Sequence, residues 1–171
     1  MSAAKSPQDA KLSGVQPDIT LFVYGKLKEG FSDHRKFAAQ LKQKRGTAQT
    51  SASYPLAVPK QPQCFDPECH MVHKDPHLIP WEGKGCGPIR GEVFVVSKEG
   101  LRLLDEFHKV NECQGLYQRV AVEVVVSTGE QKQRNLMAQT YASSNSKAVE
   151  AKVKKRLWEY IEEYTKELDA G

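Results

Sequence analysis

The alternation of apolar and polar residues predicts a chain built mainly from β-strands. The strand candidates are rich in β-branched and aromatic residues, either at alternate positions or in continuous apolar runs. They are Ile19–Tyr24, Leu56–Val58, Ile89–Ser97, Leu116–Ser127 and Leu136–Ala142. Continuous runs such as GEVFVV indicate strands that are buried on both faces, as in a small closed or strongly curved sheet.

Fewer segments show helical spacing. His34–Lys44 follows the cap-like pair Ser32-Asp33, and Lys98–Phe107 follows Ser97, whose hydroxyl can cap a helix. Both segments place leucine and phenylalanine side chains three or four residues apart, which puts them on one face of a helix.

The chain of 171 residues has the length of one domain with appended tails. Residues 1–17 are mostly small or polar and are interrupted by prolines and a glycine, so we expect a disordered tail there. The domain is expected over 18–145, with an irregular, proline-rich excursion at 59–88. The last segment is 146–171. Apolar residues recur there every three or four positions over Ser146–Leu168, which predicts an amphipathic C-terminal helix packed on the domain.

Charge and cysteine usage narrow the class of protein. The net charge of +4 comes from 25 basic and 21 acidic residues spread along the chain, which argues against nucleic acid as a partner. No apolar run reaches membrane-spanning length, and the N-terminal residues have no apolar core of a signal peptide. The four cysteines are therefore expected to be free thiols in a reducing compartment, and we expect a cytoplasmic protein.

Cys64, Cys69, His70 and His73 supply four metal-ligand side chains within ten residues. Structural zinc sites usually take their ligands as two well-separated pairs, whereas these pairs are contiguous. The pattern favours free thiols and solvent-exposed histidines over a metal site.

The first strand ends at an unusual junction. Tyr24 and Gly25 close the apolar run, and Lys26 and Lys28 follow at once. A glycine there indicates that the backbone turns or approaches something closely. The junction is either a plain turn or a loop whose amide groups hold an anionic ligand.

This junction and several later blocks resemble the γ-glutamylcyclotransferase-like family, and within it the γ-glutamylamine cyclotransferases. The blocks occur in the family's order between about residues 19 and 143. They are YGKLKEGFSDHR, YPLAVP (Tyr54–Pro59), IPW (Ile79–Trp81), GEVFVV (Gly91–Val96), LLDEF (Leu103–Phe107) and LYQR (Leu116–Arg119).

The resemblance implies an α+β fold, a small mixed or antiparallel β-barrel with flanking helices and one pocket. It also implies release of 5-oxoproline from a γ-glutamyl amine or peptide without a metal or cofactor. The α-amino group attacks the γ-carbonyl, and one glutamate accepts and returns the proton. By the same resemblance, the segment Tyr24–Leu27 holds the glutamyl carboxylate through Tyr24, Gly25, Lys26 and Leu27, and Tyr117 faces the pocket.

The chain departs from the family at the proposed site itself. The family pattern L-D-x-F-E ends here in His108, and Lys26 stands where the loop normally has Ser or Thr. His108 could act as the base, since an imidazole titrates near neutral pH. Glu112, in a longer loop, could take the vacated place, or neither residue is catalytic. A histidine that compensates the end of a helix dipole is the structural interpretation of His108.

Two hypotheses remain open at this point. The first is a cyclotransferase in which His108 or Glu112 replaces the usual glutamate. The second is a non-catalytic ligand-binding or assembly protein on the same fold, which contacts a protein partner through residues 59–88 or the C-terminal helix. The missing carboxylate favours the second hypothesis, and the otherwise intact pocket-forming blocks favour the first.

Overall fold

The computed structural model describes residues 18–57, 76–84, 87–112, 115–129 and 132–144, and the backbone of 58–59 and 153–157. The elements, in chain order, are β1 (Ile19–Val23), α1 (Ser32–Lys36), β2 (Gln43–Ser53), β3 (Leu56–Pro59), β4 (His77–Leu78), β5 (Pro88–Val96), α2 (Lys98–Phe107), β6 (Tyr117–Thr128), β7 (Lys132–Ser143) and β8 (Val153–Leu157).

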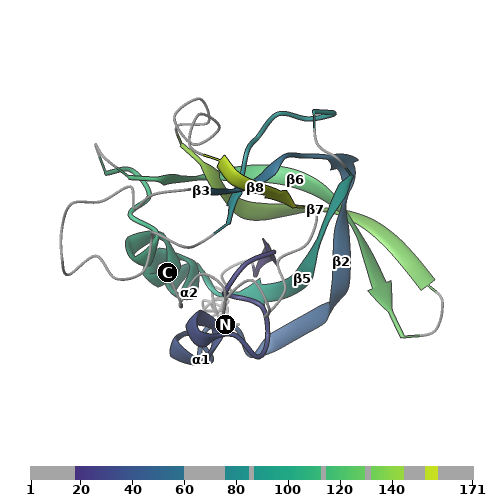
Figure 1. Cartoon of the computed structure of the whole chain (residues 1–171). Helices are drawn as coiled ribbons and strands as arrows, with labels where there is room; N and C mark the ends of the chain where they lie inside the picture. The colour runs from purple at the N-terminus through teal and green to yellow at the C-terminus, as the bar shows by residue number, and fades with distance from the viewer. Residues whose placement is uncertain are drawn as a thin grey trace, which may run out of the picture.

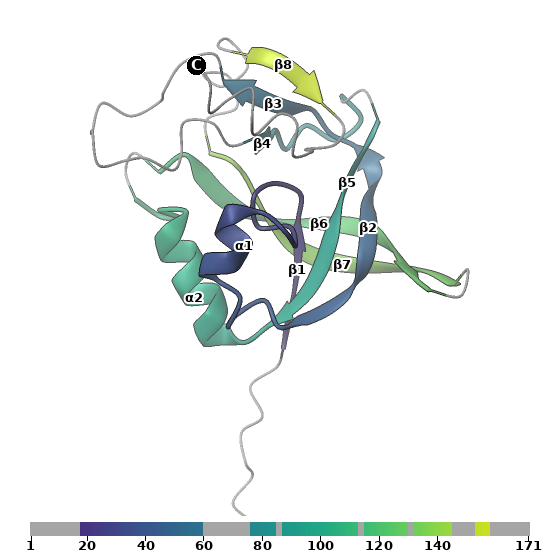
Figure 2. The ribbon, with the colours of Figure 1, turned by 60° about the horizontal axis from the view of Figure 1, so that its bottom comes forward.

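The strands β1, β5, β2, β6 and β7 close into a barrel (Figures 1 and 2). Neighbours in this order pair antiparallel, and a parallel pairing of Leu21 in β1 with Gln139 in β7 completes the ring. β4, β3 and β8 continue the sheet beyond β7. The structure therefore confirms the predicted α+β fold, a small mixed β-barrel with flanking helices.

Side chains from opposite faces of the same strands fill two apolar clusters. The first cluster lies inside the barrel, contains no helix residue, and includes Phe22 of β1 and Val93 of β5. Leu21 and Phe94, their neighbours along each strand, pack outside it together with Leu104 of α2. Because both faces are covered, apolar residues occupy consecutive positions at 21–23 in β1 and 93–96 in β5, as the sequence pattern predicted.

β2 is a strand that the sequence pattern does not predict, because most of its residues are polar. Only Ala48 and Thr50 of β2 are buried. The Thr50 hydroxyl donates to the Ala52 carbonyl at 2.6 Å and accepts the Ile89 N–H at 2.8 Å, so the buried polar group is satisfied. Pairing with β5 on one side and β6 on the other makes this segment a strand despite its composition.

The helix predicted over Lys98–Phe107 is confirmed with the same bounds. The Ser97 hydroxyl accepts the Gly100 N–H at 3.0 Å and caps its first turn. Leu101 and Leu104 are buried against the barrel wall. α1 and α2 lie side by side on the same flank of the barrel (Figure 2).

The prediction of a helix over His34–Lys44 is wrong in its bounds and in its N-cap. α1 covers only Ser32–Lys36, its N-cap is Phe31, and no side chain caps it. Beyond Phe37 the chain turns, and Gln43 begins to pair with β5. The predicted helix therefore gives way to a turn after Phe37, and its last two positions, 43 and 44, already belong to β2.

The structure also differs from the predicted C-terminal helix. Val153–Leu157 forms β8, which pairs antiparallel with β3, so the helical prediction is wrong for these residues. The pairing covers the edge of β3 that β4 leaves open. The rest of 146–171 lies outside the described residues, as do the tail 1–17 and residues 60–75 of the excursion with the Cys64, Cys69, His70 and His73 cluster.

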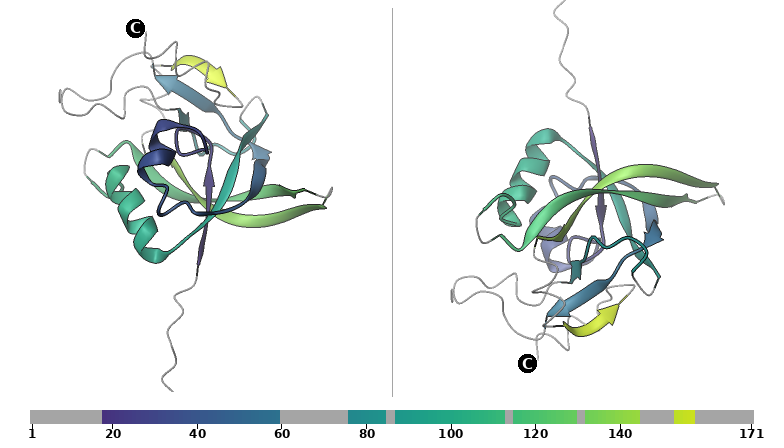
Figure 3. Two further views of the ribbon diagram at one scale, coloured as in Figure 1. Left: turned by 90° about the horizontal axis from the view of Figure 1, so that it is seen from below. Right: turned by 90° about the horizontal axis from the view of Figure 1, so that it is seen from above.

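Within the predicted excursion, β4 pairs with β3 and, in parallel, with β7. The β6–β7 hairpin projects from the barrel on the side away from the helices (Figure 3). Among the helices that the structure describes, none is long and apolar enough to span a membrane.

Candidate active site

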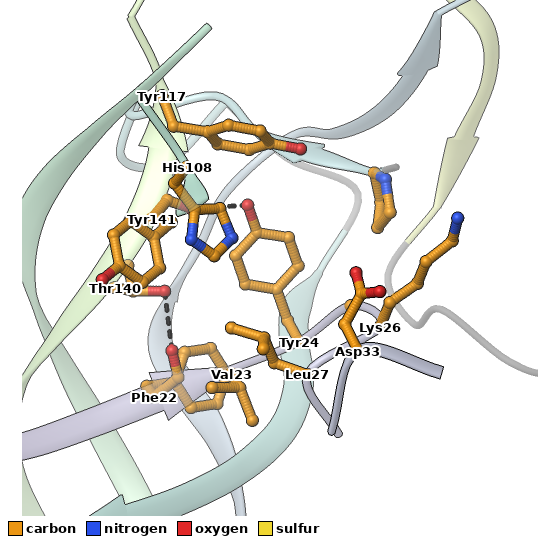
Figure 4. Close-up of a pocket in the computed structure, with 12 residues that line it drawn as sticks. Phe22, Val23, Tyr24, Lys26, Leu27, Asp33, His108, Tyr117, Thr140 and Tyr141 are labelled. Carbon is orange, nitrogen blue, oxygen red and sulfur yellow. Dashed lines mark hydrogen bonds between the residues drawn. The ribbon is translucent and has the colours of Figure 1, made fainter. Parts of the chain in front are cut away.

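A narrow pocket lies where β1 ends, between the loop that follows β1 and the end of α2. Its empty space is about 370 Å³, part of which is open to solvent. Of the site residues predicted from the sequence, it brings together Tyr24, Gly25, Lys26, Leu27, His108 and Tyr117 (Figure 4). The remaining lining residues are Phe22, Val23, Asp33, Pro76, Thr140 and Tyr141.

The loop after β1 is a tight turn. The Lys28 N–H donates to the Gly25 carbonyl at 3.0 Å. Within the described ranges, the N–H groups of Gly25 and Leu27 donate to no acceptor. Backbone N–H groups left unpaired in a turn can hold an anion. The loop therefore has the donors that a carboxylate needs.

Glycine at position 25 allows the loop to approach Pro76 closely. A Cβ at this position would lie 3.2 Å from Cγ of Pro76, tighter than ordinary van der Waals contact. Pro76 immediately precedes β4, so the glycine lets the loop pack against the strand that follows the excursion.

His34 of α1 fixes the same loop from the other side. Its backbone N–H donates to the Lys26 carbonyl at 3.1 Å, and its Nδ1 lies 3.0 Å from the Leu27 carbonyl oxygen. Because a carbonyl only accepts, the second contact places the hydrogen on Nδ1. The two bonds hold the loop and α1 as one unit.

Tyr24 lines the pocket with its ring, and its hydroxyl is already engaged. The hydroxyl donates to the Tyr141 carbonyl at 2.5 Å and accepts the Leu78 N–H at 3.0 Å (Figure 4). The ring therefore shapes the pocket while the hydroxyl joins the end of β1 to β7 and β4.

His108 is the residue at which α2 ends. Its Nδ1 lies 2.8 Å from the Leu104 carbonyl oxygen, a contact that again requires the hydrogen on Nδ1. This contact joins the His108 ring to the last turn of α2. It also leaves Nε2 unprotonated, with a lone pair and no partner in the described part of the chain.

The surroundings of His108 keep its ring neutral. Burial lowers the pKa of His108 to about 4, although the bond to Leu104 acts in the opposite direction. The ring stacks on Tyr141 with centroids 3.9 Å apart and meets Tyr117 edge-on at 5.2 Å. At neutral pH the pocket therefore contains an imidazole whose free nitrogen is a proton acceptor.

Asp105 accepts a hydrogen bond from Tyr141, the residue on whose ring His108 stacks. The Tyr141 hydroxyl donates to Asp105 Oδ1 at 2.8 Å, and Nε of Arg119 lies 3.0 Å from the same oxygen. Burial, together with the Asp105 charge, raises the pKa of Tyr141. The LLDEF and LYQR blocks therefore meet in one network behind the pocket.

A second neutral histidine lies behind Tyr117. His77 is 0% exposed, and its ring stacks on Tyr117 with centroids 4.5 Å apart and planes 3° apart. Neither ring nitrogen finds a hydrogen-bond partner in the described part of the chain. Burial lowers the pKa of His77 to about 4, so this imidazole is also neutral at pH 7.

The structure does not bring Glu112 to the pocket. Its side chain is exposed in a turn in which Lys109 and Asn111 have positive φ values of 52° and 71°. Glu106 is exposed as well, with its carboxylate 3.1 Å from the Arg102 guanidinium. Neither glutamate lines the site.

Sequence reasoning missed two polar residues that line the pocket. Thr140 is buried, and its hydroxyl donates to the Phe22 carbonyl at 2.8 Å. Asp33 is 4% exposed and is the carboxylate among the described lining residues. Its position next to Ser32 suggests a helix cap, and only the fold places it in the pocket.

Among the described residues, no group of three or more His, Cys, Asp or Glu side chains is arranged to hold a metal ion. The polar groups of the described pocket are backbone amides, the His108 imidazole, the Asp33 carboxylate, the Lys26 amine and the hydroxyls of the lining tyrosines and threonine.

Comparison with known proteins agrees with this geometry. The family model described as "Gamma-glutamyl cyclotransferase, AIG2-like" matches residues 21–160. Gamma-glutamylaminecyclotransferase from Rattus norvegicus is 34% identical over 110 residues, which cover 62% of this chain and 63% of the rat protein. The human protein of the same name is 33% identical over 107 residues, covering 61% of this chain and 60% of its own length. The chain thus matches less than two thirds of the length of these relatives.

Among solved structures, an AIG2-like protein from Mus musculus superposes with a TM-score of 0.57 at 28% sequence identity. That match covers 74% of this chain and 78% of the mouse protein. The family match, which extends over most of the residues, and the barrel with its loop after β1 lead to one conclusion. This chain belongs to the γ-glutamyl cyclotransferase, AIG2-like family.

Proposed function

We propose that this protein releases 5-oxoproline from a γ-glutamyl amine or peptide, with His108 as the proton carrier. The observation that carries the proposal is the position of His108. Its unprotonated Nε2 belongs to the same pocket as the Gly25 and Leu27 amides. Membership of the family and relatives named gamma-glutamylaminecyclotransferase support this type of activity.

In the proposed reaction the α-carboxylate of the γ-glutamyl unit accepts hydrogen bonds from the Gly25 and Leu27 amides. The α-ammonium gives a proton to Nε2 of His108, and its nitrogen attacks the γ-carbonyl carbon. As the C–N bond to the amine half breaks, His108 returns this proton to the departing nitrogen. The attacking nitrogen still carries two hydrogens and a positive charge, and it loses a second proton through His108 to the released amine. Of the three ammonium hydrogens, one remains in the lactam and two leave with the amine, so that RNH departs as RNH₃⁺.

The packing of the ring suits this task in two ways. The Leu104 carbonyl and the Tyr141 face fix the orientation of His108, and a fixed orientation reduces the entropic cost of the transfer. Once a proton reaches Nε2, the ring becomes an imidazolium in contact with apolar surfaces. That state is short-lived because burial disfavours the charge, which promotes return of the proton.

A second function, ligand binding without turnover, is favoured by a specific observation. With a pKa of about 4, His108 takes a proton from an ammonium group less readily than a base that titrates near 7. Neither Glu106 nor Glu112 lines the pocket to replace it. In this alternative the pocket holds a γ-glutamyl compound and leaves it intact.

The test is release of 5-oxoproline from a panel of γ-glutamyl amines and γ-glutamyl dipeptides at pH 7. Wild type should turn over at least one substrate, and His108→Ala should lower kcat by roughly 10²- to 10⁴-fold. Glu112→Ala is the matched control and should behave as wild type. A folded wild-type protein that turns over no substrate would support binding alone, and a fully active His108→Ala variant would show that another group moves the proton.

A further inference from the structure

We propose that Asp33 binds the α-ammonium group of the ligand. Together with the Gly25 and Leu27 amides, it makes the pocket selective for compounds with a free α-amino-acid head group. This inference rests on the ligand class of the proposed function and adds the residue that recognises the positive end of that ligand.

The first observation is that Asp33 is buried and that its side-chain contacts within the described part of the chain are long. Its Oδ1 lies 3.4 Å from the Ser32 hydroxyl and 3.5 Å from Nζ of Lys36, whose side chain is 51% exposed. By contrast, Asp105 accepts a hydrogen bond at 2.8 Å and an Arg119 contact at 3.0 Å. A carboxylate that is removed from water needs strong partners. A cationic ligand group in the pocket would supply a closer partner than Lys36 does among the described residues.

The second observation is where Asp33 lies. It lines the pocket, and Figure 4 shows its carboxylate beside Lys26, with the Tyr24 ring between Asp33 and His108 in this view. The loop after β1 and α1 carry the amides and the carboxylate, and the two bonds from His34 join these segments. The group that binds the carboxylate and the group that binds the ammonium are therefore held at a fixed separation.

The third observation concerns the other polar groups of the pocket. The hydroxyls of Tyr24, Thr140 and Tyr141 all donate to acceptors within the protein. His108 is neutral, and the charge of Lys26 has the sign that suits the ligand carboxylate. Among the described lining residues, Asp33 is thus the group whose charge is complementary to an ammonium.

Such an arrangement distinguishes ligand from product. Cyclisation converts the ammonium into a neutral lactam nitrogen, which cannot form an ion pair with Asp33. We expect 5-oxoproline to bind more weakly than an uncyclised γ-glutamyl compound, and the loss of this ion pair to promote product release.

The experiment compares two ligands that differ only in the α-amino group. L-glutamine has the group, and 5-amino-5-oxopentanoate lacks it. Binding of each to wild type, Asp33→Asn and Asp33→Glu is followed by ligand-observed NMR, which also reveals any 5-oxoproline formed. Asp18→Asn removes an exposed carboxylate that does not line the pocket and serves as the control for net charge.

Wild type should prefer L-glutamine, and Asp33→Asn should weaken L-glutamine binding about tenfold or more while leaving 5-amino-5-oxopentanoate unchanged. Asp33→Glu should retain part of the preference. Equal affinity of wild type for the two ligands would overturn the inference without any variant, as would an Asp33→Asn protein that weakens both equally. Asp33-dependent binding without 5-oxoproline would uphold the inference and show that L-glutamine is bound but not turned over, so that the panel of γ-glutamyl amines and dipeptides decides the proposed turnover. No binding of either ligand to wild type would overturn the inference.

Discussion

The imidazole of His108 lies almost flat on the phenol ring of Tyr141, with centroids 3.9 Å apart and ring planes 10° apart. The Leu104 carbonyl fixes the same imidazole at Nδ1, and Asp105 fixes the hydroxyl of Tyr141. These contacts determine which nitrogen of His108 faces the pocket. His108 is thus held as firmly as a structural residue, and its Nε2 has no partner in the described part of the chain.

Tyr141→Phe should separate the two contributions of this tyrosine. The variant keeps the aromatic face and loses the hydrogen bond to Asp105, so the free energy of unfolding in urea should fall by about 1–3 kcal/mol. The rate of 5-oxoproline release should stay close to that of wild type, because the stack on His108 remains. A folded Tyr141→Phe protein without turnover would instead assign the hydroxyl a part in the reaction.

Stability should depend on pH through two histidines. Burial lowers the pKa of His77 and of His108 to about 4, whereas an unfolded histidine titrates near 6.5. Between these values the unfolded chain binds more protons than the folded one, so the free energy of unfolding rises with pH. The contribution is complete above about pH 6.5 and is lost as the pH falls toward 4. Urea unfolding measured at several values in this window should show a loss on the order of 1–3 kcal/mol per histidine.

His77→Phe tests which part of this dependence comes from the buried ring behind Tyr117. Phenylalanine can keep the stack on Tyr117 and removes two ring nitrogens that have no partner in the described part of the chain. The variant should be as stable as wild type or more stable at pH 7, by up to about 2 kcal/mol, with a shallower loss toward pH 4. A clear loss of stability at pH 7, with an unchanged pH dependence, would contradict this account of His77.

Gly25→Ala should impair the site through Pro76. The new Cβ would lie 3.2 Å from the proline ring, so the loop has to shift by a few tenths of an ångström. We expect KM for the γ-glutamyl substrate to rise on the order of severalfold, because the amides that hold its carboxylate move. Gly87→Ala is the control, since a Cβ there would meet nothing within 4 Å. Equal KM values for the two variants would show that the position of the loop does not matter.

Much of the barrel could be predicted from the sequence because its strands are buried on both faces. β1 and β5 carry apolar residues on both faces, the buried valines of β6 alternate with more exposed residues, and Ser97 marks the start of α2. β2 could not be predicted, since its inward positions are Ala48 and Thr50 and its identity depends on pairing with β5 and β6. β8 was missed for the same reason, because its partner β3 is almost a hundred residues away in the chain.

The candidate site could be predicted only in part. The resemblance located the loop after β1 and the position of His108, and the structure places them in one pocket. Asp33 carries no signal in the sequence, because an aspartate after a serine is typical of helix starts. Its burial beside the loop follows from the packing of α1, which local patterns do not contain.

The acid side of the pH–rate profile tests the central claim most directly, namely that a neutral His108 accepts the proton at Nε2. The measurement is kcat/KM for 5-oxoproline release between pH 7 and pH 5, where the substrate ammonium stays protonated. Because kcat/KM reports the pKa of the free enzyme's base, it should remain nearly constant over this range if the pKa of His108 is about 4. A loss of half the activity near pH 6.5 would show an ordinary, exposed histidine at work and would contradict the account.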